Sequence, residues 1–434
     1  MKKLLLILVF LSPLWVAPLW GGGCFAQGDF TRIYHPIINE AELAIVDTNY
    51  YEALDFYKEA FANVKKPFAK DYYNAAICAA MAGKLPLTLE YLEKIVEKGY
   101  PADSLRKDVF FHYVADTCKR WSTFEKQMKL VKPNINRELR DSLNKLYALS
   151  TKEIYTPLTP ELRKFYKETF KYKPDSTKKE TVAYRIIFPT DSLIFNTQMP
   201  KNIKQQYDSL QKINDKIYSK NNEIAFQKTM QFVENDGFPD ENIIGLSGND
   251  TKRVSKFGNI YTYYQDYHEF VFVKSLTSSL LTNTFASSDK EMLPFIIQAI
   301  REGKVQPDQI NHIIPLRFNK ITKAMDGLPI AYSMGKVQVI QLQLESNLTC
   351  ENAKEIGNKK FWKKEKLGEY SEVEINEKRQ DIGLEKLKDA YKKAFFKANR
   401  TPFIINGGFY QKEVSYISSC EVLEKIMKES VPVK

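Results

Sequence analysis

Two helical hairpins that repeat at a fixed spacing near the start of the chain constrain its fold more than any other feature. Small residues recur where two helices cross closely, and larger residues lie between them to fill the space around each crossing. The matched positions, each pair 35 residues apart, are Ala41 and Ala76, Ala44 and Ala79, Tyr50 and Leu85, Ala53 and Thr88, Tyr57 and Leu92, and Ala60 and Ile95. The spacing predicts that the two hairpins stack on each other.

This pattern resembles tetratricopeptide repeats over about a quarter of the chain. The small residues fit that family, whereas Tyr72 and Ala76 stand in place of its usual tryptophan and first glycine. The resemblance implies an α-solenoid, which presents an extended concave surface to a partner and performs no chemistry itself.

Turn residues predict where the repeat helices end. Gly83 breaks one helix, and the next is expected from about Leu85 to Lys98, before Gly99 and Pro101 stop it. A third, less regular hairpin over residues 103–130 is expected to cap the stack. The repeats and their cap are therefore assigned to residues 28–135.

The first 26 residues have the pattern of a bacterial export signal. Lys2 and Lys3 precede the apolar run Leu4–Trp20, and small residues precede a cut near Gln27. Two alternatives stay open, a retained membrane anchor and lipid attachment at Cys24. Cleavage is favoured, which predicts a periplasmic or extracellular protein without a membrane span.

Charge and composition favour a protein or peptide partner over nucleic acid. The formal net charge is +11, but lysine and glutamate alternate along the chain, as on solvated helix faces. The four histidines show no metal-ligand spacing, and no CxxC occurs among the five cysteines. No cofactor or metal is therefore predicted.

Cys350 and Cys420 are candidates for a disulfide, because export permits one.

The rest of the chain divides at a change in composition. Residues 136–209 are expected to begin with a charged helix and to continue as a proline-punctuated linker or insertion. Residues 210–434 are expected to form a mostly helical second domain with one small β-hairpin around Met334 and Gly335. The predicted fold class is mainly α.

The second domain is also similar, over about 40% of the chain, to a bacterial domain family of unknown function. The similarity rests on Asp236-Gly237-Phe238-Pro239, on His268 and on the closing run from Ile375 to Leu384. The chain departs from the family at residues 317–319 and 332–334. The family implies no activity for this chain.

A catalytic alternative centres on His268. Asp266 and Glu269 flank this histidine, and either carboxylate is able to raise the pKa of the imidazole toward the range of acid–base catalysis. Arg317 and Tyr332 lie in the two segments where the chain departs from the family, and they complete the candidate site. On this alternative, the protein is a hydrolase that acts on envelope material, although a helix histidine bonded to a neighbour is the favoured account of the sequence.

The favoured function is non-catalytic docking of a protein or peptide in the solenoid groove. The first helix of each repeat is expected to line the concave face. The residues predicted to lie near the partner are Ile37, Glu40, Ala44, Tyr72 and Ala79.

Overall fold

A computed structural model of the chain describes most of the repeat region and several parts of the remainder. The described residues are 30–108, 110–155, 159–169, 201–246, 272, 275–284, 289–310, 337–344, 360–364, 371–398, 401–406, 410–417, 419–429 and 431–432. The predicted export signal, residues 1–26, lies outside them.

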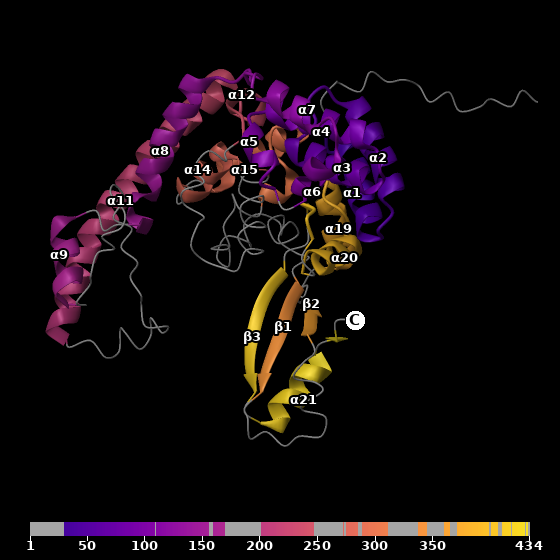
Figure 1. Cartoon of the computed structure of the whole chain (residues 1–434). Coiled ribbons are helices and arrows are strands. Elements are labelled where there is room, and N and C mark those ends of the chain that lie inside the picture. The colour runs from indigo at the N-terminus through magenta and orange to yellow at the C-terminus, as the bar shows by residue number, and fades with distance from the viewer. Residues whose placement is uncertain are drawn as a thin grey trace, which may run out of the picture.

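The described chain is mainly helical, as predicted (Figure 1). The helices of the first half are α1 (Tyr34–Val46), α2 (Tyr50–Asn63), α3 (Ala69–Met81), α4 (Leu85–Glu97), α5 (Ala102–Leu105), α6 (Phe111–Thr117), α7 (Trp121–Met128), α8 (Arg137–Tyr155) and α9 (Pro160–Thr169). The elements of the second half are α11 (Lys201–Asp236), α12 (Glu241–Ile244), α14 (Leu276–Thr284), α15 (Asp289–Arg301), the 3₁₀ turn η1 (Pro307–Gln309), β1 (Val337–Leu344), β2 (Lys360–Lys364), α19 (Glu372–Asp381), α20 (Leu387–Ala398), β3 (Tyr410–Ile417), α21 (Cys420–Glu429) and β4 (Val431–Pro432).

The first four helices form two pairs that lie against each other. Helix α1 packs on α2, α3 packs on α4, and α2 joins the pairs by packing on α3. The alanines at the matched positions of the sequence repeat, such as Ala41, Ala53 and Ala76, are buried without exposed surface. Close approach of the helices follows from these small side chains.

Local signals set the ends of these helices. The Asn49 side chain caps α2 by accepting from the Glu52 backbone N–H. Pro86 lies in the first turn of α4, where its missing N–H costs no helical hydrogen bond. Gly99 follows α4 with a φ of +97°, a conformation that glycine adopts without strain. Helix α4 therefore has nearly the bounds predicted from the sequence.

The expected linker, residues 136–209, contains more helix than the sequence analysis predicts. Helix α8 continues to Tyr155, α9 follows it, and α11 begins at Lys201. Helices α8 and α11 run side by side away from the repeats, with α9 against α11 at the far end (Figure 1). Leu162 and Phe165 of α9 are buried there. The helices extend beyond the one predicted there because apolar faces on α8, α9 and α11 supply mutual packing.

The described strands form a four-stranded sheet in the order β3-β1-β2-β4, where the sequence predicts one small hairpin. Strand β1 pairs antiparallel with β2 and parallel with β3, so that Val337 lies opposite both Lys364 and Tyr410. A parallel pair needs a long connection, and α19 and α20 lie within it. The expected turn at Met334 and Gly335 lies outside the described residues.

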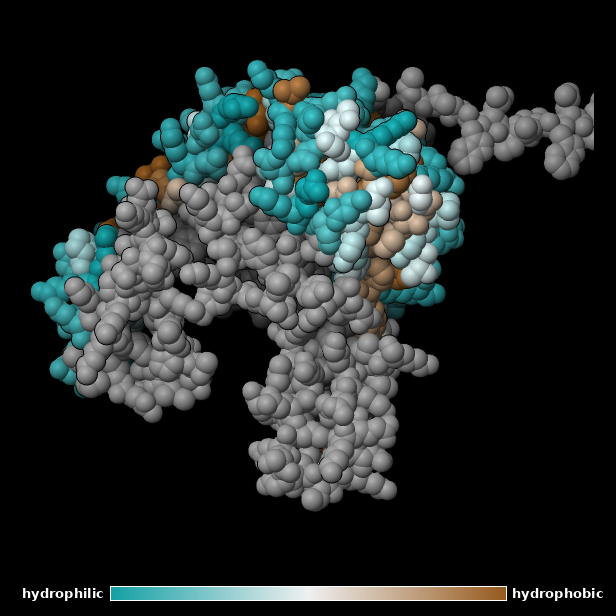
Figure 2. Space-filling view, in the orientation of Figure 1, coloured by the Kyte–Doolittle hydropathy of each residue, from teal (hydrophilic) through white to brown (hydrophobic). Residues whose placement is uncertain are grey.

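Helix α20 and the turn that follows α19 pack directly on the repeats. Helix α20 contacts α1, and the Asn39 side chain of α1 donates to the Gly383 carbonyl at 3.2 Å. Phe30, just before α1, donates its backbone N–H to the Arg301 carbonyl at 2.7 Å. On the face shown in Figure 2, hydrophilic side chains cover most of the described surface of the repeats and of α8 and α11.

Among the described helices, none is both long and apolar enough to cross a membrane. Cys78 and Cys118 are free and buried, whereas Cys420 is in a disulfide bond. The partner of Cys420 lies outside the described residues, as does Cys350. The pairing of Cys350 with Cys420 stays a prediction.

Gly303 provides a test of the packing between Phe30 and the end of α15. Its φ of +69° is in the left-handed region, and a Cβ atom there would overlap the Phe30 ring. Gly83 has a similar φ of +72° but open space around it. We expect Gly303→Ala to lower the free energy of unfolding by about 3 kcal/mol, from backbone strain plus overpacking, and Gly83→Ala by only about 1 kcal/mol.

Urea unfolding of the two variants measures this difference. Equal losses would mean that backbone strain alone acts at both glycines and that Phe30 does not pack on Gly303.

Candidate functional site

Polar side chains gather on one side of α1 and α3, here named the α1–α3 face and defined by Glu42, Lys70, Asp71 and Asn74. In α3, Lys70 is four residues and Asp71 is three residues before Asn74. Side chains at these spacings lie on one face of a helix. All four residues are buried. Buried charge is costly unless it is paired, so the partners of these groups identify what the face binds.

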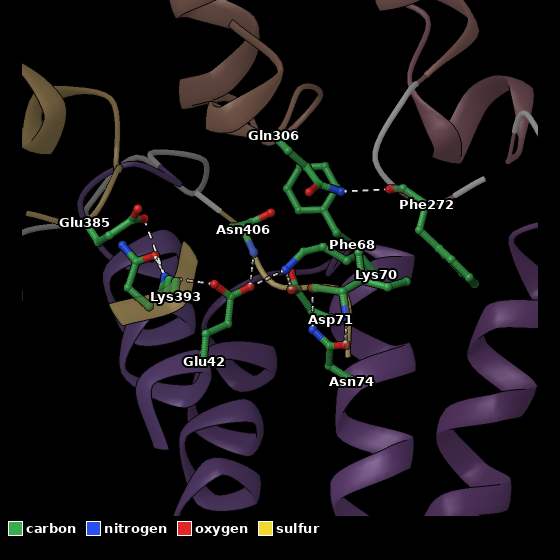
Figure 3. Close-up of polar contacts among 12 residues, drawn as sticks. Glu42, Phe68, Lys70, Asp71, Asn74, Phe272, Gln306, Glu385, Lys393 and Asn406 are labelled. Carbon is green, nitrogen blue, oxygen red and sulfur yellow. Dashed lines mark hydrogen bonds and ion pairs between the residues drawn. The ribbon is translucent and has the colours of Figure 1, made fainter. Parts of the chain in front are cut away.

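Glu42 is the centre of this arrangement (Figure 3). Its carboxylate accepts from Lys70 of the neighbouring repeat and, at 2.8 Å, from Lys393 of α20. The backbone N–H of Asn406 donates to the same carboxylate at 3.0 Å. One side chain of α1 therefore contacts α3, α20 and the segment that precedes β3.

The charge network continues beyond Glu42 in both directions. Lys70 also pairs with Asp71 at 2.6 Å. On the other side, Lys393 lies 3.4 Å from Glu385, which in turn pairs with Arg379 at 3.1 Å. The six groups comprise three cations and three anions, so the buried cluster is neutral overall.

The cluster sets the pKa of its members. Burial alone would raise the pKa of Glu42, but Lys393 and Lys70 outweigh it and lower the pKa to about 2. Burial would lower the pKa of Lys70, but Asp71 and Glu42 raise it above its usual value. For Asp71, burial outweighs the attraction of Lys70, so the pKa of this carboxyl is raised. Because Glu42, Lys70 and Lys393 have no exposed side-chain surface, a substrate cannot reach these charges.

The α1–α3 face holds a segment of the chain itself, residues 401–406, which is neither helix nor strand. Asn74 makes two hydrogen bonds with the main chain of Ile404: its amide donates to the carbonyl at 2.8 Å, and its carbonyl accepts from the N–H at 2.9 Å. Phe403 stacks on Tyr50, with 5.8 Å between the ring centroids. Phe403, Ile404 and Ile405 belong to the same hydrophobic core as the repeat helices.

Burial corrects part of the predicted partner surface. Ala44 is 7% exposed and Ala79 is fully buried, so neither is accessible to a partner. Both alanines occupy matched positions of the 35-residue spacing, which identifies the close-packed side of a helix. Of the other predicted residues, Glu40 is exposed, while Ile37 and Tyr72 are half-buried.

A surface pocket of about 380 Å³ lies beside Tyr72, and we name it the lysine pocket. Helices α3, α4 and α12 contribute to its walls, together with the loops that precede α3 and α8. It is lined by Lys65, Lys66, Pro67, Tyr72, Lys94, Glu97, Lys98, Asn134, Ile135, Glu241 and Asn242.

The catalytic candidates His268, Asp266, Glu269, Arg317 and Tyr332 all lie outside the described residues. Their convergence stays a prediction. Within the described residues, no group of three or more histidine, cysteine or acidic side chains is arranged to hold a metal ion.

Sequence analysis missed Glu42, Asn74, Lys65 and Lys66. A signal for the first two exists, because Glu42 lies between Ala41 and Leu43 and Asn74 precedes two alanines in an otherwise close-packed helix. A polar residue at such a position needs a buried partner. Lys65 and Lys66 lie in the turn after α2, and nothing in the sequence around them indicates a pocket.

Comparison with models of protein families, with curated proteins and with solved structures finds no match to this chain.

Removal of the Asn74 amide tests how residues 401–406 are held. In Asn74→Leu, the N–H and carbonyl of Ile404 lose their partners, and leaving two buried polar groups unpaired costs about 3 kcal/mol. We expect lower stability in urea and faster hydrogen exchange at residues 403–406. Asn63→Leu is the control, because Asn63 also bonds a main-chain carbonyl but is exposed. Unchanged exchange at residues 403–406 would contradict the role of Asn74.

The lowered pKa of Glu42 predicts a specific pH dependence. Its stabilising contribution is present above the pKa of the unfolded chain, about 4.3, and is lost as the pH falls toward about 2. The raised pKa of Asp71 acts in the opposite sense, so a difference between variants is the clearer readout. We expect Glu42→Gln to be about 3 kcal/mol less stable than the wild type at pH 7, with the gap narrowing as the pH falls from about 5 to about 2.

Thermal unfolding as a function of pH measures this gap, with the exposed Glu59→Gln as the control. A gap that stays constant over this range would show that Glu42 is not held ionised by the two lysines.

Proposed function

We propose that this chain is an exported, non-catalytic repeat protein that docks a protein or peptide partner. In this proposal the two helix pairs form a tetratricopeptide-like solenoid. The protein works in the periplasm or outside the cell after the signal, residues 1–26, is removed.

In this proposal the partner does not dock in the solenoid groove predicted from the sequence but on a different surface. Residues 401–406 occupy the α1–α3 face, where Asn74 and Glu42 bind their main chain. A tethered segment competes at a high effective concentration, so a free peptide would have to displace buried apolar side chains as well. The partner therefore docks elsewhere on the repeats.

The lysine pocket is the observation that carries the proposal. It is open at the surface of the repeats, and Tyr72, one of the residues predicted to meet a partner, lines it. The Tyr72 ring packs on Phe61 and Tyr91, with centroid distances of 4.5 Å and 6.0 Å. A tyrosine held in place by such packing offers contact area at little entropic cost, as is common at protein interfaces.

Blocking the pocket without disturbing the core tests the proposal. Asn134 is exposed at the pocket, and Asn134→Trp adds a large side chain there. We expect this variant of the full mature chain to lose at least about tenfold in partner recovery from an envelope extract, because steric exclusion removes the contact surface. Asp47→Trp, an exposed substitution at the opposite end of α2 from Lys65, should recover the partner like the wild type.

Quantitative mass spectrometry of the captured proteins provides the measurement. Equal recovery by both variants and the wild type would show that the pocket is not the docking surface.

A further inference from the structure

The lysine pocket brings together cations from two separate stretches of chain. Lys65 and Lys66 lie in the loop between α2 and α3, and Lys94 lies in α4, which Lys98 directly follows. The pocket also contains two carboxylates. Four ammonium groups against two carboxylates leave an excess of positive charge.

The two carboxylates are already paired with the cations at and just after α4. Glu97 pairs with Lys94 at 3.0 Å, and Glu241 pairs with Lys98 at 2.9 Å. Glu241 is buried and also accepts from the Ala69 backbone N–H at 2.8 Å. These contacts fix Glu241 in the wall of the pocket, so it does not neutralise the remaining lysines.

Lys65 and Lys66 are exposed and form no ion pair within the described part of the chain. Both line the pocket, and the Tyr72 hydroxyl adds a hydrogen-bond donor to the same lining. Burial raises the pKa of Tyr72 to about 12, so the hydroxyl keeps its proton at neutral pH. The two ammonium groups and the Tyr72 hydroxyl are therefore donors, which complement an anion.

The size and the apolar parts of the pocket favour an acidic side chain over a bare inorganic anion. A volume of about 380 Å³ is at the lower end for ligand pockets. Pro67, Ile135 and the Tyr72 ring contribute apolar surface beside the ammonium groups. An aspartate or glutamate side chain has a short alkyl stem for such surface and a carboxylate for the lysines.

We propose that the lysine pocket binds carboxylate side chains of an acidic segment in the docked partner, with Lys65 and Lys66 as the pairing cations and Tyr72 as a further donor. This inference rests on the proposed docking function and assigns the chemistry of the partner.

A labelled peptide of six glutamates measures the interaction directly by fluorescence anisotropy on the full mature chain. We expect Lys65→Gln/Lys66→Gln to raise the dissociation constant about tenfold, because two exposed ion pairs are lost. Lys107→Gln/Lys119→Gln removes the same charge from exposed positions outside the pocket and should leave the dissociation constant unchanged. Binding to the wild type should also weaken as NaCl rises from about 0.05 M to about 0.5 M.

Three outcomes would overturn the inference. Equal weakening by both double variants would indicate attraction to net charge rather than to the pocket. Equal binding of a six-serine peptide would remove the need for carboxylates. Stabilisation of the wild type, but not of Lys65→Gln/Lys66→Gln, by inorganic phosphate without binding of the glutamate peptide would assign the pocket to a phosphate group.

The docking function can be judged separately. If Asn134→Trp abolishes partner recovery while Lys65→Gln/Lys66→Gln leaves it intact, the pocket docks a partner and the acidic chemistry is wrong. If neither substitution changes recovery, the docking surface itself is wrong.

Discussion

The carboxylate of Glu42 joins three parts of the chain that are far apart in sequence. It pairs with Lys70 of the second repeat, with Lys393 of α20 and with the main chain of Asn406. Burying such a group is unfavourable unless all of its partners are in place. The contact therefore contributes more to the choice of one packing arrangement than to net stability. An alternative arrangement of α20 on α1 would leave buried charges without partners.

The local part of the fold follows from the sequence, whereas its long-range part does not. The alanine spacing predicts α1 to α4 because those helices pack on their neighbours in the chain, and Gly99 marks the end of α4 correctly. Lys393 lies 351 residues from Glu42, and Ile404 lies 330 residues from Asn74. No regular spacing in the sequence connects residues so far apart. The sequence therefore shows that Glu42 and Asn74 need partners but not which residues supply them.

The same distinction explains the candidate site. Ala44 and Ala79 were predicted to meet a partner because they lie on the first helix of each hairpin. Both alanines are buried in the hydrophobic core that also contains Phe403, Ile404 and Ile405, so neither is accessible to a partner. Tyr72 lies on the same helix as Ala79 but lines the lysine pocket. Of the five residues predicted to meet a partner, Tyr72 is the one in that lining. The pocket was not predictable, because Lys98 and Glu241 meet only through tertiary packing.

The lysine pocket and the buried charge cluster share the first turn of α3, and this constrains how docking affects the fold. Glu241 accepts from the N–H of Ala69, and the next residue, Lys70, pairs with Glu42. A ligand that drew Lys98 away from Glu241 would leave a buried carboxylate without its cation, at a cost of several kcal/mol. Within the described residues, Lys65 and Lys66 have no such partner to lose. The proposed acidic segment would therefore bind at lowest cost to these two lysines and leave the core beneath α3 unchanged.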